Sequence, residues 1–265
     1  EPLAIAKIYT AKDRPSFDPL ITHVTNIADA FALVHTFPAL AQKLAEQFWP
    51  GPLTLLLPKR EHVPDLLTSG LDKMAIRVPN HPMTLNLLKN ISFPLAAPSA
   101  NPFGYVSPTT AAHVDQQLGA KIPYILDGGP AHIGLESTIV SIEENIICVH
   151  RLGGLDIEML RTFGEVNVLR HTKSNPDAPG QLDSHYAPRK KIIIGDLEEL
   201  LLRYSDIKTG ILSFSKTYLH PYKSIALSPD GDVNEAAEHL FSALRTLDTE
   251  DIDLILAEYV PQKGI

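Results

Sequence analysis

The sequence predicts an α/β protein with two units, a twisted mixed sheet flanked by helices and a smaller Rossmann-like α/β domain. Short apolar runs alternate with segments of helical periodicity over residues 1–168. Residues 169–190 interrupt this alternation with Pro176, Pro179 and Pro188, a composition typical of a linker. The alternation then resumes over residues 191–265, which carry −6 of the chain's net charge of −8. We therefore expect a first domain at 1–168, a linker at 169–190 and a second domain at 191–265.

Helices of the first domain are expected where apolar residues recur every three or four positions, at 3–11, 38–48, 82–88, 109–118 and 155–163. Ser107 and Pro108 would cap and open the fourth of these helices. Strands are expected where a short apolar run is bounded by turn residues, at 20–24, 53–57, 75–78, 95–97, 124–126, 138–142 and 146–149. The last two strands would form a hairpin, which favours a mixed sheet over a purely parallel one.

The second domain begins with a strand and keeps a strand–helix–strand rhythm. Its expected order is strand 191–194, helix 197–202, strand 210–214, helix 233–247 and strand 253–257. Strands joined through helices are typical of a small, doubly wound parallel sheet.

The composition excludes several classes of protein. Apolar residues make up 44% and charged residues 20%, which is typical of a globular domain, and no apolar run approaches the length of a membrane helix. The single cysteine, Cys148, can form neither an internal disulfide nor a structural zinc site, so we expect a cytoplasmic protein. A net charge of −8 argues against strong direct binding of nucleic acid.

The chain has no phosphate-binding P-loop, no dinucleotide glycine motif and no nucleophile elbow. Its candidate functional residues are instead polar groups next to the expected strands. Lys12 and Arg14 could face an anion or belong to an ordinary charged loop, and Ser99 could line a crevice or a turn. Arg77 interrupts an apolar strand, so it would bind either a carboxylate ligand or a structural ion-pair partner.

Eight segments together resemble the threonylcarbamoyl-AMP synthase family of YrdC type, in the family's order across about residues 1–165. They are 11–23, 48–54, 75–79, 97–101, 107–109, 125–129, 134–140 and 151–153. Residues 184–188 and the acidic second domain resemble the family's long, two-domain form. The chain departs from the family in beginning after its opening strand, in Asp18 where Asn is usual, and in Leu152 where Pro is usual.

The resemblance implies a nucleotidyltransferase that condenses L-threonine, bicarbonate or CO2, and ATP into L-threonylcarbamoyladenylate, with release of pyrophosphate. ATP would arrive with Mg2+, and no residue of this chain is assigned as a metal ligand. The product would serve the t6A modification of tRNA, so downstream t6A transferase proteins and tRNA would be indirect partners, without any membrane. The threonine amine is itself the nucleophile, which agrees with the lack of a nucleophile motif here.

The resemblance also implies roles for individual residues. Lys12 and Arg14 would be catalytic and face the phosphates of ATP. The expected ATP-binding residues are Arg14, Asp18, Lys73, Ser99, Asn101, Ser107, Arg151 and Tyr186. The expected threonine-binding residues are His23, Arg77, Ala97 and Ser137. The linker residues 181–187 would close over the nucleotide as a lid, the alternative being a flexible connector.

Three other functions stay open on the sequence. The chain could be a non-catalytic RNA-binding module, a carbamoyl-transfer domain of the hydrogenase-maturation type, or an inactive remnant of the family. The acidic balance argues against the first, and the lack of zinc-finger cysteines argues against the second.

Overall fold

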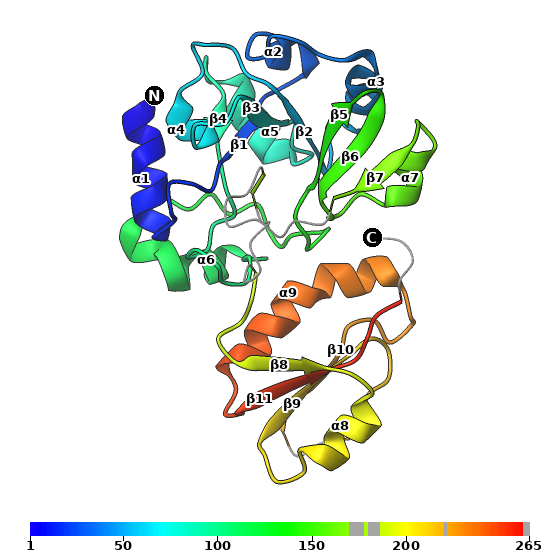
Figure 1. Cartoon of the computed structure of the whole chain (residues 1–265). Helices are drawn as coiled ribbons and strands as arrows, with labels where there is room; N and C mark the ends of the chain where they lie inside the picture. The colour runs from blue at the N-terminus through cyan, green and yellow to red at the C-terminus, as the bar shows by residue number, and fades with distance from the viewer. Residues whose placement is uncertain (170–177, 180–185, 220–221, 262–265) are drawn as a thin grey trace.

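The computed structural model describes residues 1–169, 178–179, 186–219 and 222–261. The first domain is built on a seven-stranded sheet with the order β4-β1-β3-β2-β5-β6-β7. Its strands are β1 (Ile21–His23), β2 (Leu53–Pro58), β3 (Lys73–Arg77), β4 (Leu95–Ala96), β5 (Thr138–Glu143), β6 (Ile146–Arg151) and β7 (Val166–Val168). In Figure 1 this sheet occupies the upper part of the molecule.

The sheet is mixed, as the sequence predicts. Its parallel pairs are β1 with β3, β2 with β5 and β6 with β7, and its antiparallel pairs are β1 with β4, β2 with β3 and β5 with β6. The pair β5 and β6 is the expected hairpin. β2 is antiparallel to β3 and parallel to β5. β5 therefore begins at the edge of the sheet where β1 and β3 end, and β6 returns to that edge.

The helices surround this sheet (Figure 1). They are α1 (Pro2–Lys12), α2 (Ile27–Phe31), α3 (Ala39–Phe48), α4 (Asp65–Thr68), α5 (Pro82–Lys89), α6 (Ala111–Leu118), a 3-10 turn (Gly119–Lys121) and α7 (Ile157–Arg161). The apolar face that predicts α3 is buried in the main core, where Leu44 and Ala45 lie beneath the sheet residues Leu53 and Leu55. Periodicity therefore identified the helix that covers one face of the sheet.

Three expectations about the first domain are wrong in detail. Residues 124–126 form no strand, and the Tyr124 and Leu126 side chains are exposed, because no neighbouring strand pairs with this apolar run. The helix expected at 109–118 begins at Ala111, where the Thr110 side chain accepts a hydrogen bond from the amide of His113, so Ser107 and Pro108 do not cap it. The helix expected at 155–163 is shortened to α7, which Asp156 caps.

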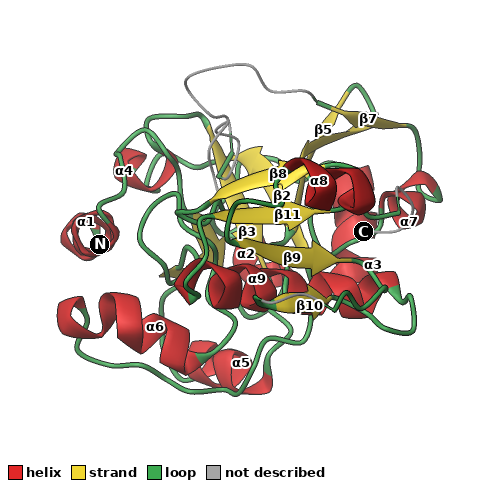
Figure 2. Cartoon of the chain, turned by 90° about the horizontal axis from the view of Figure 1, so that it is seen from below, coloured by secondary structure: helices red, strands yellow, loops and turns green. Residues whose placement is uncertain are grey.

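The second domain is a four-stranded parallel sheet with the order β10-β9-β11-β8 (Figure 2). Its elements are β8 (Lys191–Ile194), α8 (Leu197–Arg203), β9 (Thr209–Ser213), β10 (Ser224–Ala226), α9 (Val233–Thr249) and β11 (Leu254–Ala257). The Rossmann-like expectation is confirmed, with β10 as an additional edge strand. Figure 1 shows α9 between this sheet and the first domain, and α8 on the opposite side. Across the described ranges, no helix has the length and apolarity needed to span a membrane.

The core of the first domain gives a direct test of this packing. Leu55 on β2 is 1% exposed, so Leu55→Ala should lower the free energy of unfolding by about 2–5 kcal/mol through lost burial and a residual cavity. Leu3 on α1 is 73% exposed, and Leu3→Ala should change it by no more than about 0.5 kcal/mol. Urea denaturation of both variants measures the difference, and equal effects would contradict the assigned core.

Candidate active site

A cavity of about 210 Å3 lies at the edge of the first sheet where β1, β3 and β6 end and β5 begins. His23 and Arg77, which are paired in register, close the ends of β1 and β3. Eight of the predicted site residues line this cavity: Arg14, His23, Arg77, Ala97, Ser99, Ser137, Arg151 and Tyr186. Residues that are distant in sequence meet because strand ends of a mixed sheet converge on one edge.

One end of the cavity carries the guanidinium of Arg77. Arg77 Nε donates to the carbonyl oxygen of Gly51 at 2.9 Å, and within the described residues no carboxylate lies within 4 Å of its side chain. The structural ion pair that the sequence left open is therefore absent from this part of the chain. Burial lowers the pKa of Arg77, opposed by the charge of Glu136. Such a group is suited to an anionic ligand that would complete its coordination.

His23 lies beside Arg77 and is neutral at physiological pH. Burial is the main cause that lowers the pKa of His23 to about 4, and the positive charge of Arg77 contributes. Backbone groups of Ile21 and Leu95 also act on the imidazole, in the opposite direction. The His23 side chain lies in the cavity lining, so its neutral ring can face a bound ligand.

At the other end, Arg151 is held by a dense set of acceptors. Its Nε and Nη2 atoms donate to the carbonyl oxygen of Ser137 at 3.0 and 2.8 Å, and Nη2 also donates to Ser137 Oγ at 3.0 Å. Its Nη1 atom donates to the hydroxyl of Tyr186 at 3.0 Å and to the carbonyl of Pro179 at 3.2 Å. The guanidinium is therefore fixed in orientation, and it joins the first domain to Tyr186.

Arg14 is fixed in a similar way, and it explains the position of Asp18. Arg14 Nη2 lies 2.9 Å from Asp18 Oδ2 and 2.7 Å from the carbonyl of Pro19, while Nε donates to the carbonyl of Asp18 at 3.0 Å. Arg14 lines the cavity and Asp18 does not. The ion pair thus holds the Asp18 carboxylate on Arg14 and outside the lining, and the contact of Asp18 with ATP stays a prediction.

Lys12 also lies behind the cavity wall. Its Nζ atom donates to the carbonyl of Ser99 at 2.6 Å and to the carbonyl of Asn101, which connects the end of α1 to the loop after β4. Burial is the main cause that lowers the pKa of Lys12 to about 7, and the charge of Arg14 acts in the same direction. Lys12 thus orients Ser99 rather than lining the cavity itself.

Three more predicted residues lie outside the lining. Lys73 is at the opposite end of β3 from Arg77, where it pairs with Glu143 at 3.0 Å. Asn101 turns its amide into its own loop and donates to the carbonyl of Tyr105 at 2.7 Å. Ser107 donates to Glu136 Oε1 at 2.5 Å. Sequence order alone does not distinguish residues that face a cavity from residues that support its wall.

The sequence reasoning missed Glu136 as a site residue. It lies in the cavity lining immediately before Ser137, and its charge favours the protonated forms of Lys12 and Arg77. Its position in segment 134–140, next to a predicted ligand residue, was the available signal. Of the lid expected at 181–187, residues 181–185 lie outside the described residues, whereas Tyr186 lies at the cavity.

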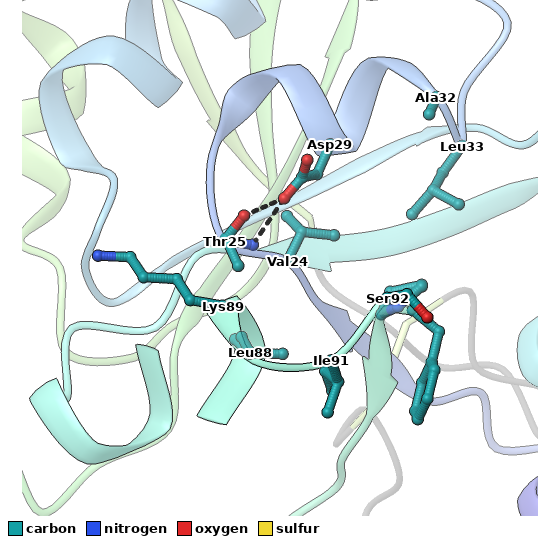
Figure 3. Close-up of a pocket in the computed structure, with 11 residues that line it drawn as sticks. Val24, Thr25, Asp29, Ala32, Leu33, Leu88, Lys89, Ile91 and Ser92 are labelled. Atoms are coloured by element: carbon teal, nitrogen blue, oxygen red, sulfur yellow. Dashed lines mark hydrogen bonds between the residues drawn. The ribbon is translucent and has the colours of Figure 1, made fainter. Parts of the chain in front are cut away.

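A second cavity, of about 430 Å3, lies between α2 and the loop after α5 (Figure 3). Its walls are mostly apolar, with Val24, Leu33 and Leu88 among them. Asp29 accepts hydrogen bonds from Thr25, and Lys89 extends away from the other labelled side chains (Figure 3). Because this cavity contains none of the predicted residues, the smaller, arginine-lined cavity is the candidate active site.

The chain resembles known proteins along nearly its whole length. Residues 1–153 match a family model described as "Telomere recombination", and residues 155–265 match one described as "Threonylcarbamoyl-AMP synthase, C-terminal domain". The chain is 38% identical to the threonylcarbamoyl-AMP synthase of Pyrococcus abyssi over 279 residues, which cover 99% of this chain and 81% of that protein. The chain belongs to the threonylcarbamoyl-AMP synthase family. The synthase of Bacillus subtilis is 36% identical, covering 99% of this chain and 80% of that protein.

Solved structures extend the likeness to three dimensions. The crystal structure of P. abyssi Sua5 complexed with L-threonine matches with a TM-score of 0.93 at 38% identity, covering 99% of this chain and 81% of that one. HypF, in a phosphate- and nucleotide-bound form, matches with a TM-score of 0.51 at 14% identity and over 36% of its length, which shows a likeness of fold alone. The predicted family and the YrdC-like fold are thereby confirmed, and the comparisons favour neither the RNA-binding module nor the carbamoyl-transfer domain.

The buried Lys12 predicts a pH dependence of stability. Burial lowers its pKa to about 7 in the folded chain, against about 10.4 for an ordinary lysine, so between these values the unfolded state binds a proton that the folded state does not. The contribution of Lys12 to folding should therefore improve as pH rises from about 7 to 10, by at most about 1.4 kcal/mol per pH unit. Lys12→Met should flatten the slope of unfolding free energy against pH, whereas Lys7→Met, at an exposed position of α1, should not. Equal slopes in the wild type and Lys12→Met would contradict this.

Proposed function

We propose that the protein is a nucleotidyltransferase that makes L-threonylcarbamoyladenylate from L-threonine, bicarbonate or CO2, and ATP, and releases pyrophosphate. The observation that carries the proposal is a cavity lined by three arginines and by one carboxylate, that of Glu136. Among the described residues, one of these arginines, Arg77, has no ion-pair partner. Arginine is well suited to both carboxylate and phosphate ligands. The family supports the same reaction, since its members at 36–38% identity are named as threonylcarbamoyl-AMP synthases.

The end of the cavity near β1 and β3 is suited to L-threonine. Arg77 can receive the carboxylate, and the neutral imidazole of His23 can accept a hydrogen bond from the amine or hydroxyl of the substrate. The relative from P. abyssi has been crystallised with L-threonine, which supports placing the amino acid in this cavity. Ser137 and Ala97 would complete the walls around it.

The other end is suited to the triphosphate. Arg14 and Arg151 would face its oxygens, and Ser99 would contact a phosphate or the Mg2+ that enters with ATP. Mg2+ is usually bound by one or two carboxylates together with substrate phosphates, and Glu136 is the carboxylate of this cavity. The described residues contain no cluster of three or more His, Cys, Asp or Glu side chains that could hold a metal without the nucleotide.

The chemistry then follows from position and charge. The threonine amine bonds to the carbon of CO2 and loses a proton to solvent, which gives a carbamate. A carbamate oxygen then attacks the α-phosphorus, and the bond to pyrophosphate breaks. The arginines stabilise negative charge on the phosphates, and no covalent bond to the protein is required. The product would supply t6A modification of tRNA through other proteins, so tRNA is an indirect partner.

The reaction gives the first test of this function. Purified protein should release pyrophosphate from Mg-ATP only when L-threonine and bicarbonate are both present, because the carbamate is the attacking group. Pyrophosphate release is followed by a coupled phosphate assay, and mass spectrometry identifies the adenylate. An equal rate when threonine is left out would refute the proposal.

Arg77 gives a test of the amino-acid site. Arg77→Met should raise the KM for threonine at least about tenfold, since removing one partner of a desolvated charge pair costs about 2–5 kcal/mol. The KM for ATP should change much less. The matched control is Arg60→Met, which removes an exposed arginine outside the cavity lining and should leave both constants near wild type. A lower melting temperature with an unchanged threonine KM would instead indicate a structural role for Arg77.

A further inference from the structure

Helix α9 of the second domain contacts the back of the active-site wall. Phe241 and Arg245 lie four residues apart on this helix, so both point to the same side, and both are buried. The core cluster that contains Phe241 also contains Val106 of the first domain. In Figure 1, α9 lies directly below the first domain. The helix is thus part of both domains' packing.

Arg245 joins α9 to the segment before α6. Its Nε atom donates to the carbonyl of Ser107 at 3.0 Å, and its Nη2 atom donates to Gln117 Oε1 at 2.9 Å. Its guanidinium also lies over the ring of Tyr105, 5.0 Å from the centroid. Ser107 in turn donates its hydroxyl proton to Glu136, the carboxylate of the cavity. Arg245 is therefore one residue removed from the cavity lining.

Phe241 joins α9 to Tyr186. The two rings are stacked with centroids 5.8 Å apart and planes at 29°. Tyr186 has a φ of 59°, which is uncommon for a residue other than glycine and persists only where the surroundings hold it. Its hydroxyl accepts the hydrogen bond from Arg151, so the position of the Phe241 ring bears directly on this arginine.

Gly134 shows how closely the wall approaches the helix. It has a φ of 73°, and a Cβ atom there would lie 2.4 Å from the carbonyl oxygen of Glu238 on α9. Only glycine permits this approach, because any side chain would overlap the backbone of the helix. The segment from Gly134 to Ser137 therefore rests on α9 at its start and reaches the cavity two residues later.

We propose that Phe241 and Arg245 of α9 are positioning residues of the active site. Phe241 acts through Tyr186 on Arg151, and Arg245 acts through Ser107 on Glu136. The second domain thereby orders the nucleotide end of the cavity, while β1 and β3 of the first domain hold the threonine end at His23 and Arg77. The assignment of one end of the cavity to ATP and of the other to threonine comes from the proposed function, and this inference rests on it.

The test compares ATP affinity with threonine affinity in the intact protein. Phe241→Leu keeps an apolar side chain but removes the stacked ring. It should raise the Kd and KM for ATP about tenfold, an effect within the range of interaction energies between residues in contact. The KM for threonine should stay within about twofold of wild type. Phe241→Tyr retains a stacked aromatic ring and should restore ATP affinity. The Kd is measured by calorimetry with a non-hydrolysable ATP analogue.

Two further variants separate positioning from loss of stability. Leu200→Ala removes a buried side chain of α8, on the far side of the second sheet, and should lower the melting temperature while leaving the Kd for ATP near wild type. In a Tyr186→Ala background, Phe241→Leu should weaken ATP binding no further. The inference is overturned if Phe241→Leu leaves ATP affinity unchanged, if Leu200→Ala weakens it equally, or if the effects of Phe241→Leu and Tyr186→Ala add. Because calorimetry needs no turnover, a failed synthase assay would reject the proposed function without deciding this inference.

Discussion

Three guanidinium groups lose much of their hydration around one small cavity, with Arg14 and Arg151 buried and Arg77 half-buried, and this is the constraint on which the structure depends. Arg14, Arg77 and Arg151 line a space that contains a single carboxylate among its described lining residues. A buried charge is unfavourable unless hydrogen bonds replace its lost water. Backbone carbonyls supply these bonds here, from residues 18 and 19 for Arg14, from Gly51 for Arg77, and from residues 137 and 179 for Arg151. Asp18 balances the charge of Arg14 in an ion pair, whereas the described residues offer only carbonyls and hydroxyls to Arg77 and Arg151, so these two keep their positive charge for anionic ligands.

The mixed topology of the sheet brings these backbone carbonyls to the arginines. Free carbonyls are found where strands end, because inside a strand they are used by the ladder. The parallel pair β1 and β3 and the antiparallel hairpin β5 and β6 bring three chain segments to one edge. The carboxylate of Asp18 is accommodated in the same arrangement, since it pairs with Arg14 and lies outside the cavity lining.

The second domain has a physical reason to be present in the same chain. A cavity wall made of loops has little internal stiffness, because loops make fewer packing contacts than strands. The loop segments around residues 105–107 and 134–137 are supported from behind by the 17-residue helix α9, which is covered in turn by its own parallel sheet.

The sequence by itself determined most of the secondary structure and the family. Periodicity located α3, α9 and the β5–β6 hairpin because each has an apolar face that one domain core buries. It failed for residues 124–126, whose apolar side chains lack a strand partner, since pairing depends on a neighbour that is distant in sequence. The motifs identified the residues around the site, but only the tertiary structure decided their roles. Arg77 and Ser99 face the cavity, whereas Lys12, Asp18, Asn101 and Ser107 support its wall, because side-chain direction is set by which carbonyls and carboxylates the fold brings within hydrogen-bond distance.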